Sequence, residues 1–118
     1  MKSMKVAIKR VYEEPKDSDG TRILVDRLWP RGLTKEKAKV DLWLKEIAPS
    51  NELRKWFAHD QKKWTEFQAR YKDELKSHPD QFALLRQEAA KGPLTLLYGA
   101  KNQEHNEAVV LEKLIGRR

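Results

Sequence analysis

The sequence contains no cysteine, and its 118 residues include five glycines, five prolines and two methionines. Without cysteine the chain cannot form disulfide bonds, thiolate zinc sites or CxxC redox centres, and it has no thiol nucleophile. Long apolar segments are also missing, because every hydrophobic run falls far short of the ~20 residues that a membrane helix needs. Lysines interrupt the N-terminal segment before a signal-peptide-like apolar stretch develops. These absences predict a cytoplasmic protein without a membrane partner.

Size and charge set further bounds. The length predicts one domain covering residues 1–118, since two hydrophobic cores would need more chain. Four tryptophans and three phenylalanines argue against a disordered chain. There are 25 Lys and Arg against 18 Asp and Glu, a net charge of +7. The positive excess is larger in residues 1–45 than in the remainder, so this part is the better candidate for meeting an anion.

Four segments have the composition of strands. Residues 5–12, 21–28 and 94–100 are rich in β-branched or other apolar side chains and are bounded by turn residues. The continuous apolar centres of the last two suit strands that are covered on both faces, as in parallel sheets. Residues 40–47 fit both strand and helix spacing, and we favour a strand over part of 41–47.

Helical periodicity fills the stretches between these strands. We expect helices to begin after Thr34, near Asn51, after Asp60, at Pro79 and after Asn102. Strands that are separated by helices predict a layered α/β domain. The sequence therefore predicts a small three-layer α/β/α domain with a mostly parallel sheet of about four strands.

Ligands of open α/β sheets bind beyond the carboxyl ends of the strands, where loops lead into helices. The segment 26–32, after the second strand, carries Arg27 and Arg31 on either side of Trp29. Arginine presents a charged fork that suits phosphate or carboxylate, and an indole stacks on a base or sugar. We expect all three side chains to bind an anionic ligand. The alternative is that Trp29 packs under the next helix while Arg27 pairs with Asp26.

The segment after the last strand offers a second anion site. Tyr98 ends the strand, Lys101 follows it, and free N–H groups lie at the expected helix start after Asn102. We expect Tyr98, Lys101 and Asn106 to contact the ligand and His105 to carry a proton. The alternative is that Asn102 is only a cap and His105 a solvated helix residue.

The pair His59–Asp60 lies between two expected helices. If the pair folds toward the strand ends, His59 or Asp60 becomes a general acid or base; otherwise it is a structural joint. The three histidines lack metal-ligand spacing, so we expect no metal site. The sequence lacks the motifs of phosphate-binding loops, dinucleotide-binding folds, nucleophile elbows and HExxH helices. It therefore does not identify a cofactor.

These residues support one leading hypothesis and two alternatives. The leading hypothesis is a small phosphorylated or otherwise anionic ligand at the strand ends, and the residue types leave open whether it is only bound or also converted. The first alternative is a nucleic-acid-associated protein that places Arg31, Lys35, Lys37 and Lys39 on phosphates. The second is a regulatory interaction module without a ligand.

Residues 22–32, RILVDRLWPRG, resemble a motif of the family known as domain of unknown function 488, in its small YeaO-like branch. Further matching segments are DLWLKEIAPS at 41–50, LRKWF at 53–57 with His59-Asp60, LLY at 96–98, and Glu104-His-Asn106. The resemblance therefore covers about residues 5–115, and the combination of VDRLWPRG with WF-x-HD is a specific signature.

The resemblance implies a compact, cytoplasmic α/β/α domain of bacterial or archaeal origin with no established activity. Its motif positions are Arg27, Trp29, Pro30, Arg31, Gly32, His59, Asp60, Lys101, His105 and Asn106. As the resemblance implies, wider members of the family have a Cys near the last strand and a Cys-His-Arg sequence in the following helix. Here those places hold Tyr98 and Asn106-Glu107-Ala108, so a thiol mechanism is not carried over to this chain.

Overall fold

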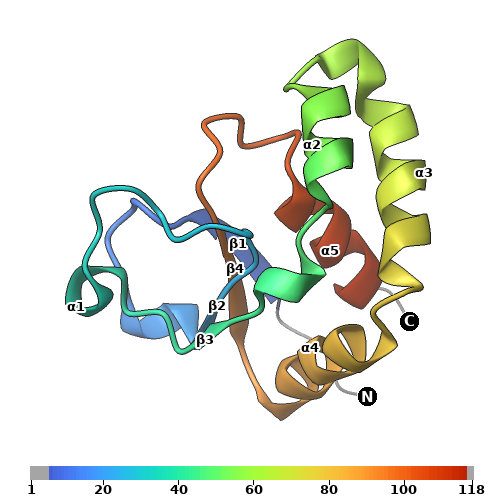
Figure 1. The fold of residues 1–118 in the computed structure, drawn as a ribbon. Coiled ribbons are helices and arrows are strands. Elements are labelled where there is room, and N and C mark those ends of the chain that lie inside the picture. Colours follow the sequence, from blue (N-terminus) through green and yellow to red (C-terminus); the bar gives the residue numbers. More distant parts are fainter. Residues whose placement is uncertain (1–5, 117–118) are drawn as a thin grey trace.

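The computed structural model describes residues 6–116 and contains a four-stranded parallel sheet (Figure 1). The strands are β1 (Val6–Arg10), β2 (Thr21–Leu24), β3 (Leu42–Trp43) and β4 (Leu94–Tyr98), in the order β1-β4-β2-β3. All three neighbouring pairs are parallel. β4 lies in the centre and all five of its residues are buried, as expected for a strand of a parallel sheet that is covered on both faces.

Helices cover the two faces of this sheet unequally. The helices are α1 (Lys35–Ala38), α2 (Asn51–Phe57), α3 (Trp64–Leu75), α4 (Pro79–Lys91) and α5 (Glu107–Gly116). Short 3-10 turns occupy Asp17–Asp19, Lys45–Ile47 and Gln61–Lys63. Figure 1 shows α2 to α5 gathered on one side of the molecule, whereas α1 lies apart at the opposite end.

Two apolar clusters correspond to these two faces. Because side chains alternate along a strand, Ile23 and Leu96 point into the large cluster under α2 to α5, whereas Leu24 and Leu97 point into a smaller one. The smaller cluster is closed by residues 29–40, including α1. The structure thus confirms the α/β class and the parallel four-stranded sheet, with most of the helical mass on one face.

The elements agree with the predictions except at several boundaries. The observed strands are shorter than the predicted ones. The strand that we favoured within 41–47 contains only Leu42–Trp43 and is followed by a 3-10 turn. The last helix begins at Glu107 and not after Asn102, which corrects the predicted cap. The side-chain oxygen of Asn106 accepts a hydrogen bond from the backbone N–H of Val109 (3.2 Å) and caps this helix.

Asn102 instead stabilises the turn before the helix. Its side-chain oxygen accepts hydrogen bonds from the backbone N–H groups of Glu104 (2.8 Å) and His105 (3.0 Å). The predicted anion-binding helix start therefore lies four residues later than expected. Within residues 6–116, each helix is too short or too polar to cross a lipid bilayer.

Candidate ligand cavity at the strand ends

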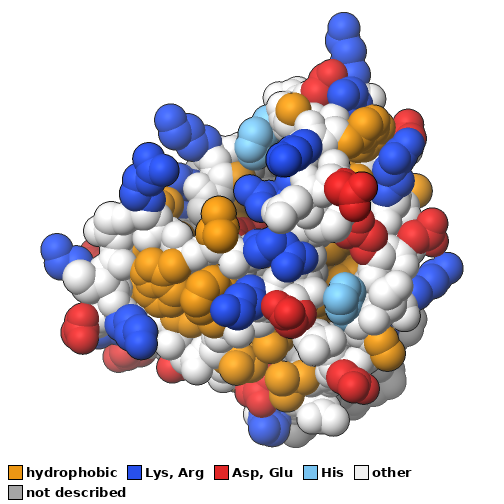
Figure 2. Space-filling model, in the orientation of Figure 1, with side chains coloured by type: hydrophobic (Ala, Val, Ile, Leu, Met, Phe, Trp, Pro, Cys, Tyr) orange, Lys and Arg blue, Asp and Glu red, His pale blue; other side chains and the backbone are white. Residues whose placement is uncertain are grey.

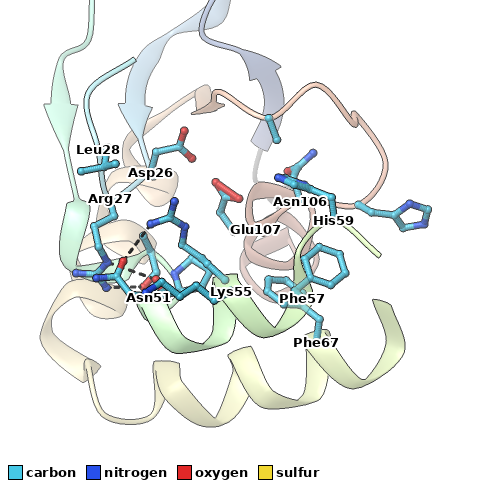
Figure 3. A pocket seen from close by; sticks show the side chains of 15 residues that line it. Asp26, Arg27, Leu28, Asn51, Lys55, Phe57, His59, Phe67, Asn106 and Glu107 are labelled. Carbon is cyan, nitrogen blue, oxygen red and sulfur yellow. Dashed lines mark hydrogen bonds between the residues drawn. The ribbon is translucent and has the colours of Figure 1, made fainter. Parts of the chain in front are cut away.

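A cavity of about 340 Å³ lies at the carboxyl ends of β2 and β4 (Figure 3). It is bordered by the loops that follow these strands, by α2 and by the start of α5. The lining residues are Asp26, Arg27, Leu28, Ala48, Pro49, Asn51, Arg54, Lys55, Phe57, His59, Phe67, Ala100, His105, Asn106 and Glu107. The cavity therefore occupies the edge of the sheet at which the sequence predicts a ligand.

Arg27 lines the cavity, but much of its guanidinium is engaged by the backbone. It donates hydrogen bonds to the carbonyl oxygens of Ala48 (3.1 Å) and Pro49 (3.4 Å), so it holds the entrance of α2 against the end of β2. The expected alternative pairing with Asp26 is not formed. Arg27 thus has a structural role in addition to its position at the cavity.

Two cations of α2, which the sequence reasoning did not select, also line the cavity. Arg54 and Lys55 are both exposed, and the Arg54 guanidinium donates to the side-chain oxygen of Asn51 (3.1 Å). Ser50 fixes the start of α2, because its hydroxyl oxygen accepts the N–H of Leu53 (3.1 Å), and both cations follow within this short helix. Arginine and lysine at a cavity mouth can bind a phosphate or carboxylate group.

His59 reaches the cavity from a turn with an unusual backbone. Ala58 and His59 both have positive φ angles, of 45° and 59°, in the left-handed region that L-residues avoid. Ala58 ends α2, and its N–H donates to the carbonyl of Arg54 (2.9 Å). His59 itself is exposed, with its ring 6.2 Å from that of Phe57, so it stands at the rim of the cavity.

This turn leads to a stability prediction. Replacing Ala58 with glycine should raise the free energy of unfolding by about 0.5–1 kcal/mol, because glycine adopts positive φ without the Cβ clash. Ala69→Gly, on the exposed surface of α3, is the matched control and should lower it by about 1 kcal/mol. Urea unfolding measures both changes. An equal loss of stability at the two positions would rule out relief of backbone strain at Ala58.

His105 and Asn106 complete the wall contributed by the loop before α5. The His105 ring packs edge-on against Trp64, with ring centroids 4.9 Å apart, and is half-buried. Asn106 is buried, and its side-chain nitrogen donates to the carbonyl of Asn102 (2.9 Å). Both residues are therefore held by the fold at the cavity.

The floor of the cavity carries two carboxyl groups that face one another, those of Asp26 and Glu107 (Figure 3). Asp26 follows β2, and its carboxylate accepts a hydrogen bond from the N–H of Gly99 (2.8 Å), the residue after β4. Glu107 is the first residue of α5. Burial, and then the hydrogen bond and the charge of Asp26, raise the pKa of Glu107 well above its ordinary value, while Arg54 acts in the opposite direction.

The other predicted site residues lie away from this cavity. Trp29 is half-buried, donates to the carbonyl of Leu33 (2.7 Å) and packs edge-on against Trp43 at 5.5 Å, which matches the packing alternative. Arg31 and Lys101 are exposed and are not among the lining residues. Asp60 caps the turn Gln61–Lys63 by accepting from the N–H of Lys62 (3.0 Å).

Tyr98 is also outside the lining, because it points into the core. It is 2% exposed, and burial raises the pKa of its hydroxyl. The structure thus brings together Arg27, His59, His105 and Asn106 from the predicted set. Within residues 6–116, no group of three or more acidic or histidine side chains is arranged to hold a metal ion.

Sequence reasoning missed Arg54, Lys55 and Glu107 as cavity residues. The two cations looked like the solvated face of an amphipathic helix, and their sequence pattern carries no further signal. Glu107 could have been found, because it stands beside Asn106 where the wider family resembles a Cys-His-Arg pattern.

Comparisons with known proteins place the chain in a family. Residues 5–118 match the family model described as "Inactive DUF488-N3 subclade". The chain is 49% identical to the uncharacterized protein YeaO of Escherichia coli (strain K12) over 108 residues, which cover 92% of this chain and 94% of that protein. It is 36% identical over 118 residues to the uncharacterized protein Rv3073c of Mycobacterium tuberculosis (strain ATCC 25618 / H37Rv), covering 100% and 99% of the two chains. No solved structure matches the chain significantly. The chain therefore belongs to the DUF488 family, within its inactive DUF488-N3 subclade.

Proposed function

We propose that this protein binds a small phosphorylated or otherwise anionic compound in the cavity at the strand ends. The observation that carries the proposal is the convergence of Arg27, Arg54 and Lys55, with His59 and His105, on one cavity. These cations come from the loop after β2 and from α2, so the fold concentrates charge that the sequence spreads out. A volume of about 340 Å³ is at the lower end of the usual range for small-molecule sites, about 300–1,000 Å³.

The family supports a binding role over turnover. Its subclade is described as inactive, and Asn106-Glu107-Ala108 occupy the places where wider members resemble a Cys-His-Arg pattern. The cavity residues could still move protons, since His59 and His105 both line it. We propose ligand binding in place of catalysis, because the cavity has cationic side chains whereas the chain has no cysteine thiol.

Calorimetric titration with ribose 5-phosphate and with inorganic phosphate tests the proposal. The double variant Arg54→Ala/Lys55→Ala should weaken binding of both probes about tenfold or more, since hydrogen bonds to charged groups contribute about 1.5–3 kcal/mol. Both side chains are exposed, so their removal should leave the fold intact. Retention of wild-type affinity in this variant would contradict the assignment of the anion site.

A charge-matched control is available on α1. Lys35→Ala/Lys37→Ala removes the same number of charges from exposed positions outside the cavity, and it should leave phosphate binding unchanged. Figure 2 shows Lys and Arg side chains spread over the face in view, so loss of affinity in both double variants would indicate a general charge effect. Retention on an RNA oligomer that falls steeply with salt and depends on Lys35 and Lys37 would favour nucleic-acid binding.

A further inference from the structure

The cavity combines two chemically different ends. Arg54 and Lys55 stand on α2 at its exposed side, whereas Asp26 and Glu107 form its floor between β2 and α5. A site for a simple anion would not place two carboxyl groups beside the charge it binds, because like charges repel. We therefore expect the ligand to carry, besides its anionic group, a second group that forms hydrogen bonds with the carboxyl groups of the floor.

The state of the carboxyl pair limits what this group is. The pKa of Glu107 is raised well above its ordinary value, first by burial and then by Asp26, which favours the sharing of a proton within the pair. Such a pair offers one O–H donor together with acceptor oxygens. Arg54 lies near enough to lower the Glu107 pKa, and so offsets part of the remaining negative charge. Hydroxyl groups both donate and accept hydrogen bonds, so they match both kinds of atom that such a pair offers.

We propose that the cavity takes a sugar phosphate, with the phosphate on Arg54 and Lys55 and the sugar hydroxyls on Asp26 and Glu107. This inference rests on the proposed function and names the ligand class of the same cavity. Phe57 and Phe67 also line the cavity, and only 6% and 3% of their surfaces are exposed. Their rings offer an apolar surface for the carbon skeleton of the sugar. Asp26 is held in place for this task by the N–H of Gly99.

The experiment compares three probes on four proteins by calorimetry. The probes are ribose 5-phosphate, 2-deoxyribose 5-phosphate and inorganic phosphate. The proteins are the wild type, Glu107→Ala, Glu107→Gln and Arg54→Ala/Lys55→Ala. Glutamine is the conservative control because its amide, like a protonated carboxyl, both donates and accepts hydrogen bonds. Thermal unfolding of each variant checks that the fold is retained.

We expect Glu107→Ala to weaken ribose 5-phosphate about tenfold and to change inorganic phosphate less than about twofold. Glu107→Gln should recover most of the sugar-phosphate affinity, and the cation variant should weaken all three probes. Wild-type affinity for ribose 5-phosphate in Glu107→Ala would overturn the sugar assignment while the anion site stands. Equal affinity of the wild type for ribose 5-phosphate and for inorganic phosphate would also overturn the sugar assignment. Failure of every probe to bind the wild type would overturn the proposed function itself.

Discussion

Replacing Asp19 with alanine is expected to lower the free energy of unfolding by about 3–5 kcal/mol, because it leaves a buried cation without its partner. The Asp19 carboxylate accepts hydrogen bonds from the Arg22 guanidinium (2.5 Å) and from the Lys9 ammonium (3.1 Å). Arg22 is 4% exposed and also donates to the backbone carbonyls of Ala38 and Lys39. The network joins β1, β2 and the segment under the second face of the sheet.

The same residue predicts a pH dependence. Burial alone would raise the pKa of Asp19, but hydrogen bonds from the Lys16 N–H, Lys9 and Arg22 outweigh it and hold the pKa below its ordinary value. The stabilising contribution is therefore present above the pKa of an unfolded aspartate and is lost as the pH falls through the lower folded pKa. Asp19→Asn should reduce the loss of stability between roughly pH 5 and pH 2.

Urea unfolding at several pH values measures both effects. Asp17→Ala, which changes an exposed acidic residue of the same 3-10 turn, is the matched control and should alter stability by less than about 0.5 kcal/mol. A similarly small effect of Asp19→Ala would mean that the buried network contributes no net stability. An unchanged acid profile in Asp19→Asn would contradict the lowered pKa.

Gly20→Ala should have an effect of similar size by a different mechanism. Gly20 has φ 67° and ψ −140°, a conformation open almost only to glycine. An added Cβ would lie 2.7 and 2.9 Å from the carbonyl carbon and Cβ of Pro93, and closer still to the Pro93 carbonyl oxygen. That oxygen accepts the N–H of Thr21 (3.0 Å) where β2 meets β4. We expect a loss of about 3–5 kcal/mol from backbone strain and steric overlap together.

Gly32→Ala separates the two causes. Gly32 also has a positive φ, of 84°, but no atom lies within 4 Å of the position that a Cβ would take. Its substitution should therefore cost only the backbone term, roughly 1–2 kcal/mol. Equal losses at both glycines, measured by urea unfolding, would show that contact with Pro93 contributes nothing.

The parallel sheet could be predicted because its signal is local. The uninterrupted run Ile23–Val25 and the run after Leu94 have no polar alternation, which is typical of strands covered on both faces, and both are buried. Residues 40–47 could not be assigned, since their apolar spacing fits a strand and a helix equally. Pairing with β2 selects a two-residue strand at Leu42–Trp43, which the local sequence does not specify.

The start of α5 illustrates a second limit. Asn102 and Asn106 both have side chains suited to an N-cap, and nothing in their immediate neighbours ranks one above the other. In the structure both side-chain oxygens accept hydrogen bonds from backbone N–H groups. Glu104, which donates to Asn102, lies in a turn, whereas Val109, which donates to Asn106, lies in α5. The tertiary packing of α5 against β1 and β4 decides where the helix begins.

The absence of cysteine excluded thiol chemistry, and the charged segments after the strands predicted a ligand at one edge of the sheet. Arg27, His59, His105 and Asn106, which line the cavity, could be predicted from local chemistry, because strand ends and turns are recognisable in the sequence. Which side chains share the cavity was decided by tertiary structure alone. Trp29 packs against Trp43, while Arg54 and Glu107 converge from helices far apart in the chain. Local sequence encodes the residues available at each element, whereas the packing of distant elements determines which of them meet.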